Sequence, residues 1–270
     1  MTYKPGIYTI SNEEYHSSDG LSRSKLLTLR KSPYHFWYEY LNAGYIKKPE
    51  TDALILGSAF HTMIMEPAYF LSRYAVMDKV DGRTKVGKEY IENFKQIHKN
   101  KTILSVEMFD QLLTMQSAFS QHPQANQFID EGNIEQSLYW TDEETGLLCK
   151  CRPDIWHHNM IVDLKTTDSA AYRDFQMSAY KYGYHIQAAM MQEAFKHLFD
   201  KLMTSFVFIA CEKKEPFAIA TYILDEEAIA QGAAEFKRLL QRYKHCIENN
   251  EWPSYEPQLL TLPSYAKFEV

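Results

Sequence analysis

The chain lacks any apolar run of the roughly 18 residues that a membrane-spanning helix needs. Its most apolar stretch, residues 206–211, is only as long as a core strand. Residues 1–6 also lack the apolar segment of a secretory signal peptide. We therefore expect neither a membrane protein nor a secreted one, and we expect a cytoplasmic location.

Cysteine is scarce, with four residues in a chain of 270. Cys149 and Cys151 are two positions apart, so on a strand they share one face, and the sequence contains no CxxC pair. That spacing suits neither a zinc ribbon nor an iron–sulfur cluster. The sequence therefore predicts reduced thiols and no iron–sulfur cofactor.

The chain also lacks an excess of positive charge. It has 29 Lys and Arg against 35 Asp and Glu, which gives a formal net charge of −6. This balance argues against a protein that coats DNA regardless of sequence. It leaves open an enzyme that touches DNA in a local groove, because a few phosphate contacts are enough there.

What is present is an ordinary globular composition, 45% hydrophobic and 24% charged, with only 10 Gly and 10 Pro. A chain of this length buries roughly 75% of its unfolded surface, so it needs no disulfide to fold. No internal repeat or linker divides it. We therefore expect a single domain over residues 1–270.

Hydrophobic periodicity predicts an α/β fold, in which a mixed sheet is flanked by helices and the N-terminal third is helical. Between residues 78 and 101 the composition turns basic, which predicts a mobile loop leading into a helix. Other helices are expected after Ser22 as far as Pro33, and at residues 35–41, 54–65, 105–122, 172–199 and 226–248. Strands are expected at residues 135–140 and 147–152, as a hairpin, and at 160–165, 205–210 and 217–223.

Two carboxylates and a lysine stand out in the middle of the chain. Asp154 follows Pro153, while Asp163 and Lys165 form an Asp-x-Lys motif within the strand expected at residues 160–165. Residues two apart point to the same face of a strand, so Asp163 and Lys165 would lie side by side. The rest of this strand is apolar, so the pair would be costly to bury without compensation. A divalent cation between the carboxylates would compensate for their burial. A surface ion pair is the alternative explanation of an Asp-x-Lys motif.

Two more residues could join these groups. Glu135 opens the first strand of the hairpin and is the natural third acid, although an exposed glutamate at a strand edge explains it equally well. His61 lies in an otherwise apolar helix, where a histidine is more often a core residue than a metal ligand. The small residues Gly57, Ser58 and Ala59 precede it, which suggests close approach by another backbone or by DNA.

The order Pro-x-Asp, strand, Asp-x-Lys resembles the PD-(D/E)xK nuclease superfamily, whose fold is the restriction-endonuclease-like sheet flanked by helices. Within this superfamily, the chain resembles the nuclease domains of the RecE type (exonuclease VIII) over nearly its whole length. The segments that carry it are residues 6–16, 20–26, 56–61, 135–142, 149–154, 163–167 and 184–187.

This resemblance implies roles for individual residues. Mg²⁺, with Mn²⁺ as a substitute, would be held by His61, Asp154, Asp163 and the backbone carbonyl of Leu164. Lys165 would position or activate the attacking water, and Gln187 would organise the site. Glu135 would be an extra ligand if two ions act, and the sequence does not decide between one ion and two. Met191 stands where RecB-like relatives carry the tyrosine of a QxxxY motif.

The resemblance also implies an activity and partners. The activity would be a Mg²⁺-dependent exonuclease that degrades duplex DNA 5′→3′ and leaves a 3′ single strand for recombination. The implied partners are double-stranded DNA ends, further copies of the chain in a tetrameric ring, and an annealing protein of the RecT type, in a bacterial or phage-encoded system.

The helix after Ser22 is the segment we expect to meet the DNA end. A helix N-terminus with hydroxyl caps and nearby cations suits a terminal phosphate. An ordinary amphipathic surface helix explains the same pattern. The candidate DNA-binding residues are Ser22, Ser24, Lys25 and Arg30.

Two other functions remain compatible with the sequence. One is a catalytically inactive nuclease fold that binds DNA ends or serves as a scaffold, which the intact set of His61, both aspartates and Lys165 disfavours. The other is an unrelated metal hydrolase of small phosphoesters, which the basic segment at residues 78–101 disfavours.

Overall fold

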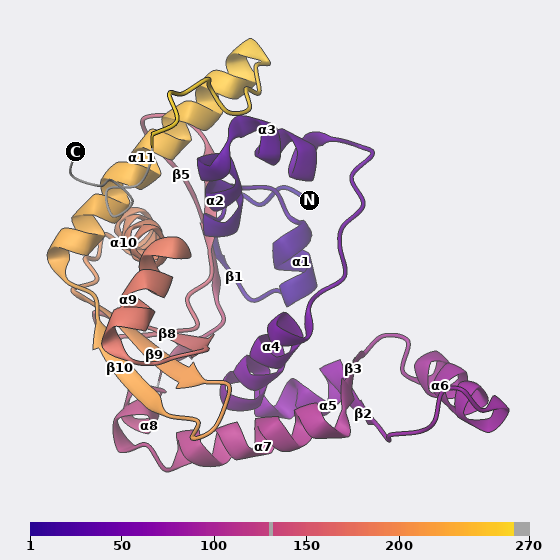
Figure 1. The fold of residues 1–270 in the computed structure, drawn as a ribbon. Helices are drawn as coiled ribbons and strands as arrows, with labels where there is room; N and C mark the ends of the chain where they lie inside the picture. The colour runs from indigo at the N-terminus through magenta and orange to yellow at the C-terminus, as the bar shows by residue number, and fades with distance from the viewer. Residues whose placement is uncertain (130–131, 262–270) are drawn as a thin grey trace, which may run out of the picture.

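The computed structural model describes residues 1–129 and 132–261 (Figure 1). Its helices are α1 (Asn12–Ser17), α2 (Arg23–Lys31), α3 (Pro33–Phe36), the π-helix η1 (Trp37–Leu41), α4 (Asp52–Met65), the 3₁₀ turn η2 (Pro67–Tyr69), α5 (Phe70–Arg73), α6 (Lys85–Ile97), α7 (Val106–Ser120), α8 (Pro123–Ile129), α9 (Tyr172–Lys181), α10 (Tyr184–Phe199) and α11 (Glu226–Asn249). Its strands are β1 (Gly6–Tyr8), β2 (Tyr74–Met77), β3 (Thr102–Ser105), β4 (Asn133–Ile134), β5 (Ser137–Thr141), β6 (Leu148–Cys151), β7 (Ile155–His157), β8 (Met160–Thr167), β9 (Ser205–Glu212) and β10 (Ile219–Ile223).

A five-stranded sheet of order β10-β9-β8-β7-β4 forms the centre of the fold. Its two longest strands, β8 and β9, run parallel, and the other neighbours are antiparallel. Both faces of a central parallel pair are covered, which is why β9 reads as a nearly continuous apolar run. The expected α/β fold with a helical N-terminal third is confirmed.

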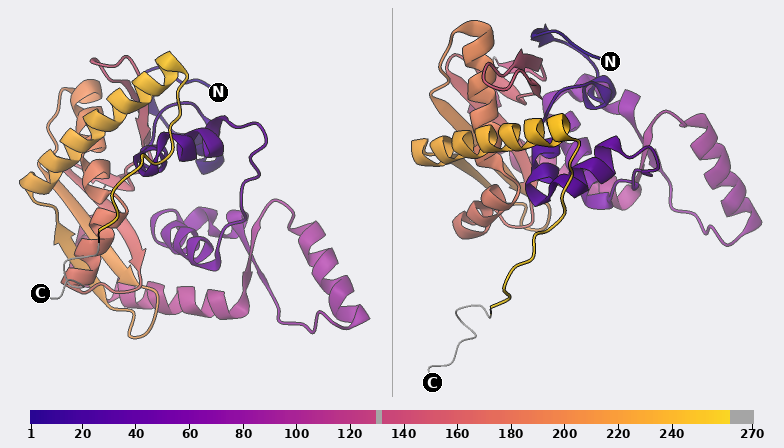
Figure 2. Two further views of the ribbon diagram at one scale, coloured as in Figure 1. Left: turned by 45° about the horizontal axis from the view of Figure 1, so that its top comes forward. Right: turned by 90° about the horizontal axis from the view of Figure 1, so that it is seen from above.

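Each face of this sheet has its own apolar core. Ile161 and Phe208 belong to the core beneath α10 and α11, together with residues of α2 and β5. Val162 and Ile209 belong to the opposite core, beneath α4 and α7. Figures 1 and 2 show the two groups of helices on either side of the strands. Because side chains alternate along a strand, Asp163 and Lys165 share the face that α10 covers.

The expected hairpin is confirmed as β5 and β6, with Leu138 opposite Cys151 and Thr141 opposite Leu148. It belongs to a separate three-stranded sheet of order β1-β5-β6. Lys150 of β6 is buried, and its ammonium donates to the carbonyl oxygens of Tyr15 and Ser18 at 2.5 and 2.7 Å. These bonds tie α1 to the hairpin.

The single helix expected over residues 172–199 is wrong, because the chain breaks it into α9 and α10. The break lies at Gly183, whose φ of +63° is the left-handed conformation that glycine adopts most easily. It turns α10 back across the sheet, so that α10 meets α11 and the hairpin (Figure 1).

The basic segment at residues 78–101 contains the expected helix, α6, and the unpredicted strands β2 and β3 flank it on either side. These strands pair in parallel, from Tyr74 opposite Thr102 to Met77 opposite Ser105. Figure 1 shows α6 at the outer end of this unit, away from the central sheet. Among the described residues, no helix combines the length and apolar character that crossing a membrane requires.

We expect Gly183→Ala to lower the free energy of unfolding in urea by about 1–3 kcal/mol, the usual cost of left-handed backbone at a residue other than glycine. The added methyl group would also lie 2.7 Å from Leu27 Cδ2 of α2. Gly44→Ala is the matched control, because the new Cβ would meet only Asn42 Oδ1, at 3.4 Å. Equal midpoints for the two variants would contradict this account of the break.

Candidate active site

A cavity of about 450 Å³ opens between α1, α2, α4, α10 and strands β6 and β8. Most of the predicted site residues line it, namely Ser22, Ser24, His61, Glu135, Asp154, Leu164, Lys165 and Gln187. Asp163 is fully buried and contacts both Lys165 and Gln187. The structure therefore brings the predicted catalytic and metal-binding residues to one place.

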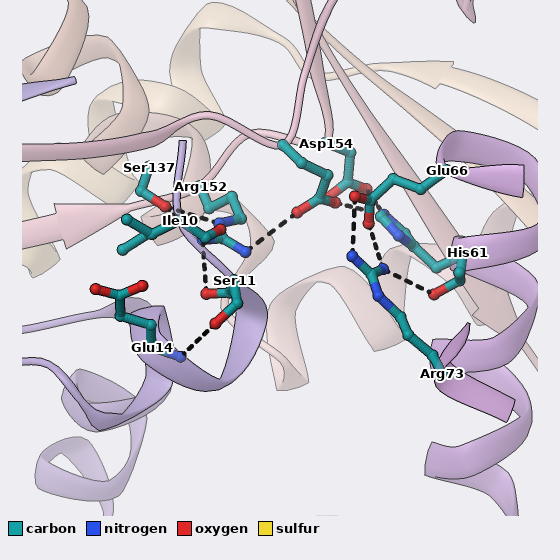
Figure 3. Close-up of polar contacts among 11 residues, drawn as sticks. Ile10, Ser11, Glu14, His61, Glu66, Arg73, Ser137, Arg152 and Asp154 are labelled. Carbon is teal, nitrogen blue, oxygen red and sulfur yellow. Dashed lines mark hydrogen bonds and ion pairs between the residues drawn. The ribbon is translucent and has the colours of Figure 1, made fainter. Parts of the chain in front are cut away.

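Three potential metal ligands converge on one point of this cavity. His61 Nε2 lies 3.1 Å from Asp154 Oδ2 and 3.4 Å from Glu135 Oε1. The ligand atoms of all three residues lie within 4.8 Å of one another. Figure 3 shows the His61 imidazole of α4 facing the carboxylate of Asp154.

Close packing and backbone hydrogen bonds hold the three residues of this cluster in position. Gly57 lies one turn before His61, where a Cβ would come within 3.0 Å of Thr166 Oγ1, so the small residue lets α4 approach β8. Asp154 is fixed by the Leu164 N–H, which donates to its Oδ2 at 2.7 Å. The Asp154 carbonyl in turn accepts from the Glu135 N–H at 3.1 Å.

Glu135 does not open the hairpin strand as expected. It precedes β5 and has a φ of +55°, a left-handed conformation in which its side chain faces the cavity beside His61. A bond from its own backbone to the Asp154 carbonyl holds it there. This left-handed conformation could not be predicted from the sequence, because it is rare at residues other than glycine and asparagine.

The second part of the site is the Asp163–Lys165 pair. The two side chains form an ion pair on the face of β8 that α10 covers. Gln187 of α10 donates from Nε2 to Asp163 Oδ1 at 2.6 Å. Asp163 Oδ2 faces the lysine ammonium but accepts no well-aligned hydrogen bond within the described part of the chain. The alternative of a surface ion pair is wrong, because Asp163 has no exposed surface.

Burial and neighbouring charges shift the pKa values of the ionisable groups at this site. Burial lowers the pKa of His61, but the charges of Asp154 and Glu135 outweigh it and raise that pKa to about 9. Burial raises the pKa of Glu135 to about 7, with His61 opposing and Asp154 adding. Burial also raises the pKa of Asp163, and the Asp154 charge adds to this. For Asp154, the His61 charge outweighs burial and lowers the pKa.

Sequence reasoning missed three arginines and one acid at this site. Arg152 Nη1 lies 3.6 Å from Glu135 Oε2. Arg73 of α5 binds both oxygens of Glu66 at 2.5 and 3.0 Å, and both residues line the cavity (Figure 3). The third arginine is Arg23 of α2, which also lines the cavity. Arg23 could have been found from the sequence, because it lies in the segment 20–26, one of those that resemble RecE-type nuclease domains.

The predicted DNA-binding residues separate into two groups. Ser22, the confirmed N-cap of α2, and Ser24 reach the cavity. Lys25 donates instead to the Gly20 carbonyl at 3.0 Å, and Arg30 donates to the Lys181 carbonyl at 2.8 Å. Neither of these two cations is among the described residues that line the cavity. Their role in binding DNA stays a prediction.

A family model described as "PDDEXK-like domain of unknown function" matches residues 22–258, which is most of the chain. The chain belongs to this PDDEXK-like family. The expected membership of the PD-(D/E)xK superfamily is thereby confirmed. No curated protein matches the chain significantly.

One solved structure shows the same fold as this PDDEXK-like chain. A crystal structure described as "Putative exonuclease", from Eubacterium rectale, superposes with a TM-score of 0.65 at 17% identity, covering 95% of this chain and 96% of that one. A phage-related exonuclease from Haemophilus somnus 129PT reaches a TM-score of only 0.34 at 12% identity, over 72% of this chain and 95% of that one. The first comparison shows the fold, and the second is too remote to support an argument.

The donor set of this PDDEXK-like site fits a divalent metal ion. Carboxylate oxygens are the ligands that Mg²⁺ prefers, and an imidazole also suits Mn²⁺. The cluster of His61, Glu135 and Asp154 offers one nitrogen and two carboxylate oxygens, whereas Asp163, the other predicted ligand, is paired with the Lys165 ammonium. Leu164 lines the same cavity. Met191 lines it too, as an apolar group.

Metal affinity should rise with pH between about 7 and 9. His61 can bind a metal only as the neutral imidazole, and its pKa of about 9 means that the ion must displace a proton below that pH. Calorimetric titration with Mn²⁺ should therefore show affinity rising by up to about tenfold per pH unit in this range.

His61→Asn should remove that slope above pH 8, because no imidazole proton is left to displace. His16→Asn is the matched control, since His16 lines the same cavity but burial lowers its pKa, so that it is neutral in this range. If the dependence of Mn²⁺ affinity on pH is unchanged in His61→Asn, His61 is a core residue and no metal ligand.

Proposed function

We propose that this protein is a Mg²⁺-dependent exonuclease that degrades double-stranded DNA from an end in the 5′→3′ direction. Its product would be a 3′ single-stranded tail for recombination by an annealing protein of the RecT type. The observation that carries the proposal is the convergence of His61, Glu135 and Asp154 with the Asp163–Lys165 pair on a single cavity.

Each residue has a task that follows from its contacts. A metal ion bound by the His61 cluster would supply positive charge to the phosphate under attack. The Lys165 ammonium lines the cavity, where it can hold the attacking water or a phosphate oxygen. Gln187 fixes the orientation of the Asp163 carboxylate. Arg152 holds Glu135 beside the cluster and also donates to Ser137 Oγ at 2.9 Å through Nε.

Asp163→Asn should reduce cleavage by about 10²–10³-fold or more, the scale of losing one preorganised electrostatic group. DNA binding should persist, because the change removes negative charge from the site. Asp168→Asn is the control, since Asp168 follows β8 but is exposed and pairs with Lys213. The measurement is digestion of end-labelled duplex in Mg²⁺ and in EDTA, and near-normal turnover of Asp163→Asn would place the reaction elsewhere.

Lys165→Ala should lose rate on a similar scale, about 10²–10³-fold, while keeping its affinity for metal. The reason is that the lysine acts on the water or phosphate and is no ligand. Calorimetry with Mn²⁺ separates the two effects. A loss of metal affinity as large as that of Asp163→Asn would contradict this division of tasks.

The same digestion tests the alternative function. A chain that binds duplex ends but cleaves nothing in Mg²⁺ would be an inactive end-binding or scaffold protein. Labelling the 5′ end or the 3′ end, with and without a 5′-phosphate, reads the polarity. Release of label from the 3′ end first would contradict the proposed direction.

The proposal includes a homo-oligomeric ring. Support comes from α6, where Val86 and Ile97 are 78% and 74% exposed on the projecting helix (Figure 1). A projecting apolar face that fits a different surface of the next copy gives a head-to-tail contact, and such contacts can close into rings. Light scattering should show an oligomer for the wild type and a smaller species for Ile97→Glu. A monomeric wild type would contradict the ring.

A further inference from the structure

Arg23 joins two segments of the chain that are distant in sequence. It is the first residue of α2, and its Nη1 donates to the Tyr182 carbonyl at 3.2 Å and to Gln187 Oε1 at 3.1 Å. Gln187 then donates from Nε2 to Asp163 Oδ1 at 2.6 Å. A continuous chain of hydrogen bonds therefore runs from the N-terminus of α2 to the buried aspartate.

The first of these bonds decides which way the Gln187 amide faces. A glutamine amide has an acceptor end and a donor end that differ little in shape. Only the donor end can hydrogen-bond an ionised carboxylate, and in the flipped orientation two oxygens would face each other. The Arg23 guanidinium can only donate, so it binds the oxygen of Gln187 and leaves the NH₂ group to Asp163.

A second contact ties Arg23 to the other catalytic group. The Arg23 guanidinium lies over the Tyr184 ring, 5.5 Å from its centroid, and the Lys165 ammonium lies 5.1 Å from the same centroid. Tyr184 is buried at the start of α10, immediately after the break at Gly183. Cations are attracted to the face of an aromatic ring, so the ring restrains both side chains.

We propose that Arg23 is a positioning residue for the reaction, and that it acts through Gln187 to present a hydrogen-bond donor to Asp163. Its place in the fold makes it a link between the helix expected to meet the DNA end and the buried carboxylate. Its kinetic consequence rests on the proposed nuclease function. Its structural consequence, the orientation of the Gln187 amide, can be measured without DNA or metal.

The structural test is NMR of the side-chain amide groups in metal-free protein labelled at glutamine. The Gln187 signal is assigned by its absence from Gln187→Met. Arg23→Gln should shift it toward the positions of exposed glutamine amides, because the bond to the carboxylate is no longer enforced. Arg23→Met, whose unbranched chain can still cover Tyr184, is a second variant should the first fail to fold. Lys31→Gln, in the exposed last turn of α2, should leave the signal unchanged.

The kinetic test is a double-mutant cycle in the digestion of 5′-phosphorylated duplex. Arg23→Gln should lower kcat by about 10–100-fold, the scale of a small misplacement, and change KM by less than about threefold. In the Gln187→Met background the same substitution should cause no further loss. Multiplying losses, or a change confined to KM, would mean that Arg23 acts on the substrate directly, and this would overturn the inference.

The two tests fail independently. An inactive wild type whose Gln187 signal moves in Arg23→Gln would overturn the nuclease function and keep the positioning role. An active wild type whose Gln187 signal stays in place in both Arg23 variants would overturn the positioning role and keep the function.

Discussion

A carboxylate without any exposed surface, Asp163, is the constraint on which the rest of the site depends. Taking an ionised carboxylate out of water costs several kcal/mol unless charge and hydrogen bonds replace the lost solvent. Lys165 supplies the charge and Gln187 the hydrogen bond. For Gln187 to reach Asp163, α10 must cross this face of β8, and the break at Gly183 is what turns α10 onto it.

The site also depends on β8 serving both faces of the sheet at once. Its side chains alternate between two apolar cores, so Asp163 faces α10 while Leu164 faces α4 and α7. The Leu164 N–H lies in the strand itself and donates to Asp154, which in turn contacts His61 of α4. Groups from both faces of one strand thus meet at its edge. Neither core alone could bring them together.

The sequence predicted the residues whose chemistry is unusual for their surroundings and missed those defined only by contact. Asp163 and Lys165 are conspicuous because charged residues two apart interrupt an apolar strand. His61 and Gln187 followed from a resemblance and not from spacing. Arg23 and Arg73 are ordinary surface-type residues until the fold places them against Gln187 and Glu66. No periodicity reports a contact between positions as far apart as 23 and 187.

Pairing of charges explains how so many acids share one cavity. Three carboxylates line it and Asp163 is buried beside it, and the chain supplies a cation for each of the four: His61 for Asp154, Lys165 for Asp163, Arg152 for Glu135 and Arg73 for Glu66. Such pairing keeps like charges close together without a metal ion. An imidazole can bind a metal ion once it has lost its proton, and with a pKa of about 9 the His61 proton is one that the ion must displace at neutral pH. Among the four pairs, His61–Asp154 is therefore the one in which a metal ion would replace a proton, and the other three pairs would keep their own cations.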